Sequence, residues 1–211
     1  MNIKKKISAL IFDMDGVLID SEKLWAVEEI NFTQKLIPNF PAQMQKKLCG
    51  LSQQGAYLFL KKNFGLNLTE KEFWKQRNNF AIEKIYKKTN LMPGVLEFIK
   101  KQKLPMAVAS SSPHEWISIV MKRFDLKKYF QEIISADDVA GVGKPAPDIF
   151  LFTAKKLNIE PQKCLVFEDS EHGVEAAKKA QMQVFGFKNG FNDNQNLEKS
   201  DQIFDSWKNL T

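Results

Sequence analysis

Phe12-Asp13-Met14-Asp15-Gly16-Val17-Leu18 is the stretch from which the fold of this 211-residue chain can be worked out. It closes an apolar run, Ile7–Asp13, that is too short for a typical helix and is therefore expected to be a strand. Gly16 marks a turn directly after that strand. Asp13 and Asp15 thus follow the carboxyl end of a strand, which in open parallel sheets is the edge where ligands bind.

Five further apolar runs of the same kind are expected to be strands, at Pro105–Ser110, Glu132–Ser135, Lys163–Phe167, Met182–Phe187 and Gln202–Phe204. Helical patterns lie between them, at Pro93–Lys103, Pro113–Phe124, Asp148–Leu157 and Gly173–Ala180. Strands that alternate with helices form βαβ crossovers, which require a parallel sheet covered on both faces. The expected fold class is therefore α/β, with a Rossmann-like parallel sheet.

The segment between the first two strands, from about Ser21 to Leu91, has a different character. Apolar residues recur there at helical spacing, and no strand pattern is present. Thr69-Glu70-Lys71-Glu72 has the form of a capping box that opens the last helix of the segment. We expect a small helical domain at residues 19–89, inserted into an α/β core made of residues 1–18 and 90–211.

Composition and charge exclude several classes of protein. The chain is 44% hydrophobic and 27% charged, which is ordinary for a folded domain. Its net charge of +6 is spread as lysines over predicted helix faces, so we expect a solvated basic surface and no nucleic-acid partner. No apolar stretch approaches the roughly 20 residues that cross a bilayer, so no membrane association is expected.

The N-terminus and the two cysteines bear on the location of the protein in the cell. Lys4-Lys5-Lys6 leads directly into an apolar strand and has none of the features of a signal peptide. Cys49 and Cys164 lie far apart and outside any metal-binding motif, which is typical of reduced thiols. A cytoplasmic protein is expected, as a monomer or weak homodimer.

Three serines follow the second strand, in Ala109-Ser110-Ser111-Ser112-Pro113-His114-Glu115. Ser112 has the position of a helix cap, with a first-position proline and a capping-box glutamate after it. A helix N-terminus presents free N–H groups and the positive end of a dipole, so Ser110 and Ser111 stand where a phosphate could be held. Three serines in an ordinary loop remain the alternative.

Two later segments place charged side chains beside predicted elements. Lys144 lies between rigid flanks in Gly143-Lys144-Pro145, where an ammonium could neutralise phosphoryl oxygens. Glu168 and Asp169 form a second acidic pair directly after a strand, and hard oxygen ligands of this kind suit Mg²⁺. If the two acidic pairs face each other, one metal ion satisfies both.

The order of these groups, acid pair, serine, lysine and acid pair, each after a strand, resembles the haloacid dehalogenase superfamily. The phrases that carry the resemblance are similar to the branch holding β-phosphoglucomutase and the small sugar-phosphate phosphatases: residues 12–22, 143–148 and 168–170. In that branch a helical cap is inserted after the first motif, in agreement with the insert expected above. The resemblance implies a Mg²⁺-dependent phosphatase acting on a small phosphorylated metabolite of the sugar-phosphate type.

The resemblance also implies a role for each matched position. Asp13 would attack phosphorus and form an aspartyl phosphate, while Asp15 would protonate the leaving oxygen and then activate water. Lys144 would act with them, and phosphate binding would fall to Ser110, Ser111 and Lys144. Dehalogenases lack an acid at the position of Asp15, so cleavage of a carbon–halogen bond is not expected. The implied ligands of Mg²⁺ are Asp13, Asp15 through its backbone carbonyl, and Asp169, with Glu168 as a ligand or a neighbouring acid.

Two positions depart from the mutase pattern. Gln53 stands where the mutase carries an arginine, and Trp25 stands where it carries a histidine. A neutral amide cannot form the bidentate charged pair that would retain a bisphosphate, so hydrolysis is favoured. A β-phosphoglucomutase-like mutase is the alternative, and a non-catalytic protein that binds phosphometabolites or nucleic acid is a second one.

The choice of substrate is expected to depend on side chains of the helical insert, and the candidates are Leu24, Trp25, Gln53 and Arg77. His114 and His172 lie close to the proposed motifs in sequence. At helix starts they are interpreted as packing or solvent-exposed groups.

Overall fold

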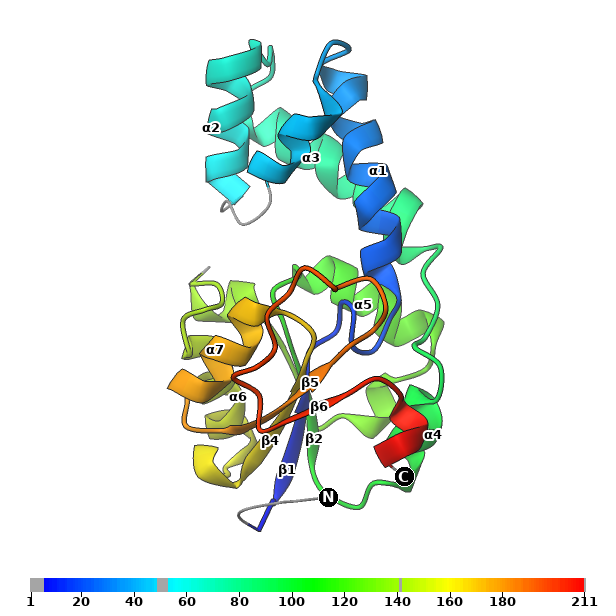
Figure 1. Cartoon of the computed structure of the whole chain (residues 1–211), viewed down its shortest axis with the longest axis vertical. Coiled ribbons are helices and arrows are strands. Elements are labelled where there is room, and N and C mark those ends of the chain that lie inside the picture. Colours follow the sequence, from blue (N-terminus) through cyan, green and yellow to red (C-terminus); the bar gives the residue numbers. More distant parts are fainter. Residues whose placement is uncertain (1–5, 49–52, 141, 211) are drawn as a thin grey trace. The chain divides into compact units, whose positions relative to one another are not determined.

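A six-stranded parallel sheet organises the larger part of the chain (Figure 1). The computed structural model describes residues 6–48, 53–140 and 142–210. The strands lie in the order β3-β2-β1-β4-β5-β6, and every neighbouring pair is parallel. Their bounds are β1 Ala9–Phe12, β2 Met106–Ser110, β3 Glu132–Ser135, β4 Cys164–Glu168, β5 Gln183–Phe187 and β6 Gln202–Phe204. The predicted α/β class is confirmed, with each strand within two residues of its expected start.

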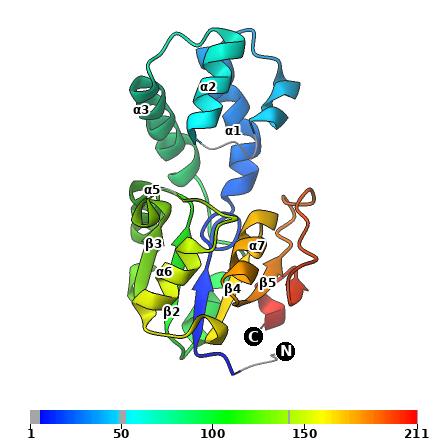
Figure 2. The ribbon, with the colours of Figure 1, turned by 90° about the vertical axis from the view of Figure 1, so that its left-hand side faces the viewer.

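Helices cover both faces of this sheet (Figures 1 and 2). α4 (Val95–Lys101) and α5 (His114–Arg123) lie on one face, while α6 (Asp148–Leu157) and α7 (Glu171–Lys179) lie on the other. Right-handed crossovers produce this division, because the chain runs outward from β1 through β2 to β3 and then returns to β4 on the opposite side. The strand order therefore reverses beside β1, and such a switch point leaves a crevice at the carboxyl ends of the central strands.

The central strand β1 is buried on both faces, as its uninterrupted apolar run requires. Ile11 belongs to the core cluster that α6 and α7 form with the sheet. Phe12 points to the opposite face, where its ring lies 4.8 Å from Phe167 and 5.9 Å from Trp207 of the C-terminal 3₁₀ helix η6 (Trp207–Leu210). Packing on two sides holds the end of β1, and with it Asp13, in a fixed position.

The chain divides into two compact units. Residues 1–22 and 89–211 form the first unit, and residues 23–88 form the second. The described residues of the second unit form helices and no strand: α1 (Ser21–Leu36), η1 (Ala42–Lys47), α2 (Gln53–Phe64), α3 (Glu70–Ala81) and η2 (Ile82–Tyr86). The predicted capping box is confirmed, since Thr69 and Glu72 each accept a hydrogen bond from the other's backbone N–H. The last helix continues without a break from α3 into η2, and its backbone changes from α to π geometry at Ile82.

The structure bears on two expectations from the composition, those about the cysteines and about membrane-spanning segments. Cys164 lies buried in β4, and burial raises the pKa of its thiol to about 11, so it is an unreactive core residue. Cys49 lies outside the described residues. Among the described helices, none combines the length and the apolar character that a membrane span needs.

Candidate active site

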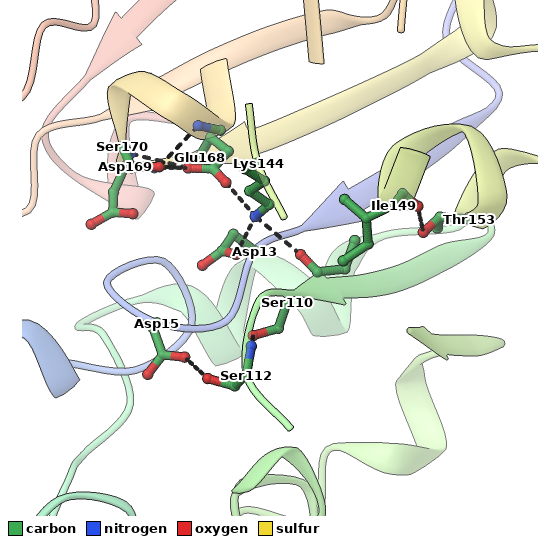
Figure 3. A network of polar contacts seen from close by, with 12 residues as sticks. Asp13, Asp15, Ser110, Ser112, Lys144, Ile149, Thr153, Glu168, Asp169 and Ser170 are labelled. Carbon is green, nitrogen blue, oxygen red and sulfur yellow. Dashed lines mark hydrogen bonds and ion pairs between the residues drawn. The ribbon is translucent and has the colours of Figure 1, made fainter. Parts of the chain in front are cut away.

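Lys144 lies at the centre of a polar network at the carboxyl ends of β1, β2 and β4 (Figure 3). Its Nζ donates to Asp13 Oδ1 and to Glu168 Oε1, both at 2.5 Å, and to the carbonyl oxygen of Ala109 at 3.3 Å. Only 6% of the lysine side chain is exposed. The loop before α6 thus reaches across the sheet and joins groups from three strands through one ammonium.

The charges around Lys144 are unbalanced. Burial alone would lower the pKa of the ammonium, but the charges of Asp13 and Glu168 raise it above its ordinary value, so the lysine stays protonated. Burial raises the pKa of Asp13 well above its ordinary value, Lys144 opposes that effect, and the charges of Glu168 and Asp15 add to it. The site therefore holds more buried carboxylate than one ammonium can compensate.

Glu168 is fully engaged by its neighbours. Its Oε2 accepts hydrogen bonds from the backbone N–H of Asp169, the backbone N–H of Ser170 and the hydroxyl of Ser170. The carboxylate also lies against Gly173 of α7, where a Cβ atom would come within 1.9 Å of it. With Lys144 on its other oxygen, Glu168 acts in this structure as the fixed partner of the lysine.

Asp169 is held by two asparagines of the loop after β5. Asn189 Nδ2 donates to Asp169 Oδ2 at 2.9 Å, and Asn192 Nδ2 donates to the Asp169 carbonyl oxygen at 2.6 Å. Burial raises the pKa of Asp169 well above its ordinary value, and the charges of Glu168, Asp13 and Glu22 contribute in the same direction. Two buried carboxylates with raised pKa values, Asp13 and Asp169, thus lie on the same side of Lys144 (Figure 3).

Asp15 points toward the β2 loop and away from Lys144 (Figure 3). Its two carboxylate oxygens accept hydrogen bonds from the hydroxyls of Ser21 and Ser112, each at 2.7 Å. The predicted cap role of Ser112 is wrong, because α5 begins at His114 without a side-chain cap and the Ser112 hydroxyl bonds Asp15 instead. This serine therefore joins the loops after β1 and β2.

The other two serines of that loop differ in their surroundings. Ser110 ends β2, is 1% exposed, and accepts the backbone N–H of Ser112 through its Oγ at 3.1 Å. Ser111 is exposed, and the described contacts do not bring it into the network. The structure thus places Ser110, but not Ser111, among the buried groups around Asp13 and Lys144.

The donor set fits a hard divalent cation. Among the described contacts, Oδ2 of Asp13 and Oδ1 of Asp169 accept no hydrogen bond, and burial disfavours the charged form of both carboxyl groups, so the pKa of each lies well above its ordinary value. The expected gathering of four carboxylates is not found, since no three acidic, histidine or cysteine side chains among the described residues form a group that could hold a metal. Mg²⁺ needs no such cage, because it is typically bound by one or two carboxylates together with waters and phosphate oxygens.

Gly16 allows the loops after β1 and β4 to approach closely. Its φ of +76° lies in the left-handed region, and an added Cβ would come within 2.0 Å of Asp169 Oδ2. We expect Gly16→Ala to displace Asp169 and to lower both the activity of the site and the stability of the fold, the backbone strain alone costing about 1 kcal/mol. Denaturant unfolding and steady-state rates measure the two effects, and Gly143→Ala, where an added Cβ has open space, is the control. Wild-type activity in Gly16→Ala would contradict the close approach.

Of the four residues of the helical unit expected to select the substrate, the structure describes the side chains of three. Arg77 pairs with Glu29 at 2.6 Å and lies 4.9 Å from the centre of the Trp25 ring, so its guanidinium already has partners within the unit. Leu24 is partly buried. Gln53 begins α2, but its side chain lies outside the described ones. A role for these residues in substrate choice stays a prediction.

Several residues of the site were not anticipated, chiefly Ser21, Asn189 and Asn192. Ser21 begins α1 and lies within residues 12–22, which carry the family resemblance, but no role was expected for its hydroxyl. Asparagines in a polar loop are common turn residues, so Asn189 and Asn192 gave no signal either. The two histidines are as expected: His114 is half-exposed and pairs with Asp138 at 3.0 Å, and His172 is exposed.

The chain is similar in sequence and in fold to known proteins. The sequence model of the haloacid dehalogenase-like hydrolases matches residues 10–187. The phosphorylated carbohydrates phosphatase of Thermotoga maritima is 31% identical over 90% of this chain and 90% of its own length. Hexitol phosphatase B of Escherichia coli is 32% identical over 86% of this chain and 84% of its own length. A β-phosphoglucomutase structure from Clostridium difficile has a TM-score of 0.76 at 25% identity, over 97% of this chain and 93% of that one.

Proposed function

The chain belongs to the haloacid dehalogenase-like hydrolases, and from that membership we propose that it hydrolyses small phosphorylated carbohydrates through an aspartyl phosphate on Asp13. Its relatives named as phosphatases make it a hydrolase of phosphoric monoesters. The same relatives include enzymes named for phosphorylated carbohydrates and for hexitols, which supports the substrate class. The observation that carries the proposal is the pairing of Asp13 with a buried, protonated Lys144.

The proposed nucleophile is held by one oxygen and available through the other. Lys144 holds Asp13 through Oδ1, which keeps a second lone pair for a cation, and Oδ2, which accepts no hydrogen bond among the described contacts, would attack phosphorus. In the first step an oxygen of Asp13 forms a bond to phosphorus while the bond from phosphorus to the substrate's ester oxygen breaks. In the second step a water oxygen attacks phosphorus, the aspartyl bond breaks, and inorganic phosphate leaves with Asp13 restored.

Asp15 would serve as the proton carrier of both steps. It would give a proton to the departing alkoxide and then take one from the attacking water, so the proton balance closes over the cycle. The hydroxyls of Ser21 and Ser112 would orient its carboxylate. Ser110 and Lys144 would bind the phosphoryl oxygens, with the ammonium compensating the charge that develops on them.

We propose Mg²⁺ as the cofactor, held by Asp13, Asp169 and the backbone carbonyl of Asp15, with Glu168 as a neighbouring acid that positions Lys144. A divalent ion there would relieve the repulsion between the two carboxylates and withdraw charge from the phosphoryl group. The helical unit of residues 23–88 would act as the cap that selects the substrate, as the resemblance implies.

A panel of phosphorylated metabolites tests the function. We expect release of inorganic phosphate from hexose phosphates and hexitol phosphates, dependent on Mg²⁺ and abolished by EDTA. The mutase alternative is tested in the same samples, because NMR of labelled glucose 1-phosphate with a bisphosphate primer distinguishes isomerisation from hydrolysis. Isomerisation without free phosphate would replace the proposal by a mutase, and salt-sensitive nucleic-acid binding without any turnover would replace it by a binding protein.

A further inference from the structure

Asn189 connects two loops of the site through a single amide nitrogen. Its Nδ2 donates to the carbonyl oxygen of Gly16 at 3.0 Å and to Asp169 Oδ2 at 2.9 Å. Gly16 belongs to the loop after β1, and Asp169 follows β4. One side chain from the loop after β5 therefore fixes the position of the acid that follows β4 relative to the loop that carries Asp13 and Asp15.

The orientation of Asn189 is itself determined by its neighbours. Its Oδ1 accepts the backbone N–H of Phe191 at 2.8 Å, and its backbone N–H donates to Asn192 Oδ1 at 3.1 Å. Asn192 is 5% exposed and donates to the carbonyl oxygens of Asp169 and Phe187. A flipped Asn189 amide would set its oxygen against two other oxygens, so only the observed orientation satisfies all partners.

The hydrogen bond from Asn189 leaves Asp169 with one available oxygen. Oδ2 is occupied by the amide, whereas Oδ1 accepts no hydrogen bond among the described contacts. A carboxylate held in this way binds a cation more readily through the oxygen without a hydrogen bond than through both oxygens, because the amide occupies one lone pair of Oδ2 and fixes its direction. Mg²⁺ demands octahedral geometry at about 2.0–2.1 Å, while Ca²⁺ takes six to eight ligands and accepts bidentate carboxylates.

We propose that Asn189 is a positioning residue that restricts Asp169 to single-oxygen binding and so sets both the affinity for Mg²⁺ and the preference for Mg²⁺ over Ca²⁺. The inference rests on the proposed function, because it assumes that Asp169 is a metal ligand. Loss of a residue that orients a ligand typically weakens metal binding by about 10–100-fold. With Oδ2 released, Asp169 can bind through both oxygens, which favours Ca²⁺.

Calorimetric titration of the metal-free full chain with Mg²⁺ and, separately, with Ca²⁺ tests this inference. In Asn189→Ala we expect the affinity for Mg²⁺ to fall by about 10–100-fold and the affinity for Ca²⁺ to fall less. Asn189→Leu keeps the branched shape without the donor and should give the same change, which keeps the test decisive if the alanine variant unfolds. Asn194→Ala removes an exposed asparagine of the same loop and should bind both ions like the wild type.

Different results would contradict the role of Asn189 and the proposed metal site on which that role rests. A wild-type chain that binds neither ion would contradict the metal assignment itself, whatever the variants do. A wild-type chain that binds Mg²⁺, together with Asn189 variants of equal affinity and equal preference, would overturn the role of Asn189 alone. A purely structural role would lower the melting temperature of Asn189→Leu in EDTA and leave both metal affinities unchanged, and that result would also overturn the inference.

Discussion

Asp13→Asn is expected to lower the rate of phosphate release by at least about 10⁴-fold, as removal of a covalent catalyst does in other enzymes. The amide has the shape of the carboxylate but no negatively charged oxygen to attack phosphorus. The protein should nevertheless remain folded without metal, and at least as stable as the wild type. Burial raises the pKa of Asp13 well above its ordinary value, which means that its charge is costly in the folded state.

Asp193→Asn provides the matched control for this experiment. The substitution makes the same chemical change at an exposed position and should alter neither turnover nor stability. Steady-state hydrolysis of p-nitrophenyl phosphate measures the rate, and thermal unfolding in EDTA measures the stability. Full turnover by Asp13→Asn would remove the nucleophile from the account.

Lys144→Met is expected to have the opposite effect on stability and a large effect on catalysis. Removing one partner of a buried ion pair typically costs about 3–5 kcal/mol, because the remaining charges stay buried without compensation. Here two carboxylates, those of Asp13 and Glu168, would lose their ammonium. Loss of a group that stabilises developing charge also lowers kcat by about 10²–10³-fold.

Urea unfolding in EDTA and steady-state kinetics measure the two consequences. The control is Lys163→Met, because Lys163 is about half-exposed and its ion pair with Glu160 lies on the surface, where such pairs contribute little. We expect that variant to keep wild-type activity and nearly wild-type stability. If Lys144→Met unfolded at the wild-type urea concentration and kept its kcat, the central role of the lysine would be wrong.

The sheet could be predicted because its signals are local. Short apolar runs between helical patterns identified all six strands, and β3, β6 and α6 have the bounds expected. The order of the strands could not be predicted in full. Alternation of strands and helices implies crossovers but does not say where the chain reverses its direction across the sheet. In the structure that reversal occurs beside β1 and places Asp13 next to the ends of β2 and β4.

The contacts within the site could be predicted less well, because they join distant segments. Ser112 bonds Asp15 across 97 positions, and Asn189 bonds Gly16 across 173. Local pattern assigned Ser112 to a helix cap, and the long-range partner Asp15 proved to hold its hydroxyl instead. The types of the charged residues indicated the chemistry, but their pairing, with Glu168 on Lys144 rather than in a cluster of four acids, depends on packing.

Mass spectrometry of the acid-quenched enzyme tests the central claim most directly, because the claim is that Asp13 carries the phosphoryl group. p-Nitrophenyl phosphate suits the experiment, since its leaving group departs without a proton and leaves only the hydrolytic step dependent on Asp15. In Asp15→Ala, the peptide that contains Asp13 should therefore accumulate the mass of one phosphoryl group during turnover, and Asp13→Asn should show none. An actively hydrolysing enzyme with that peptide unmodified, or with the phosphoryl group on another residue, would contradict the account.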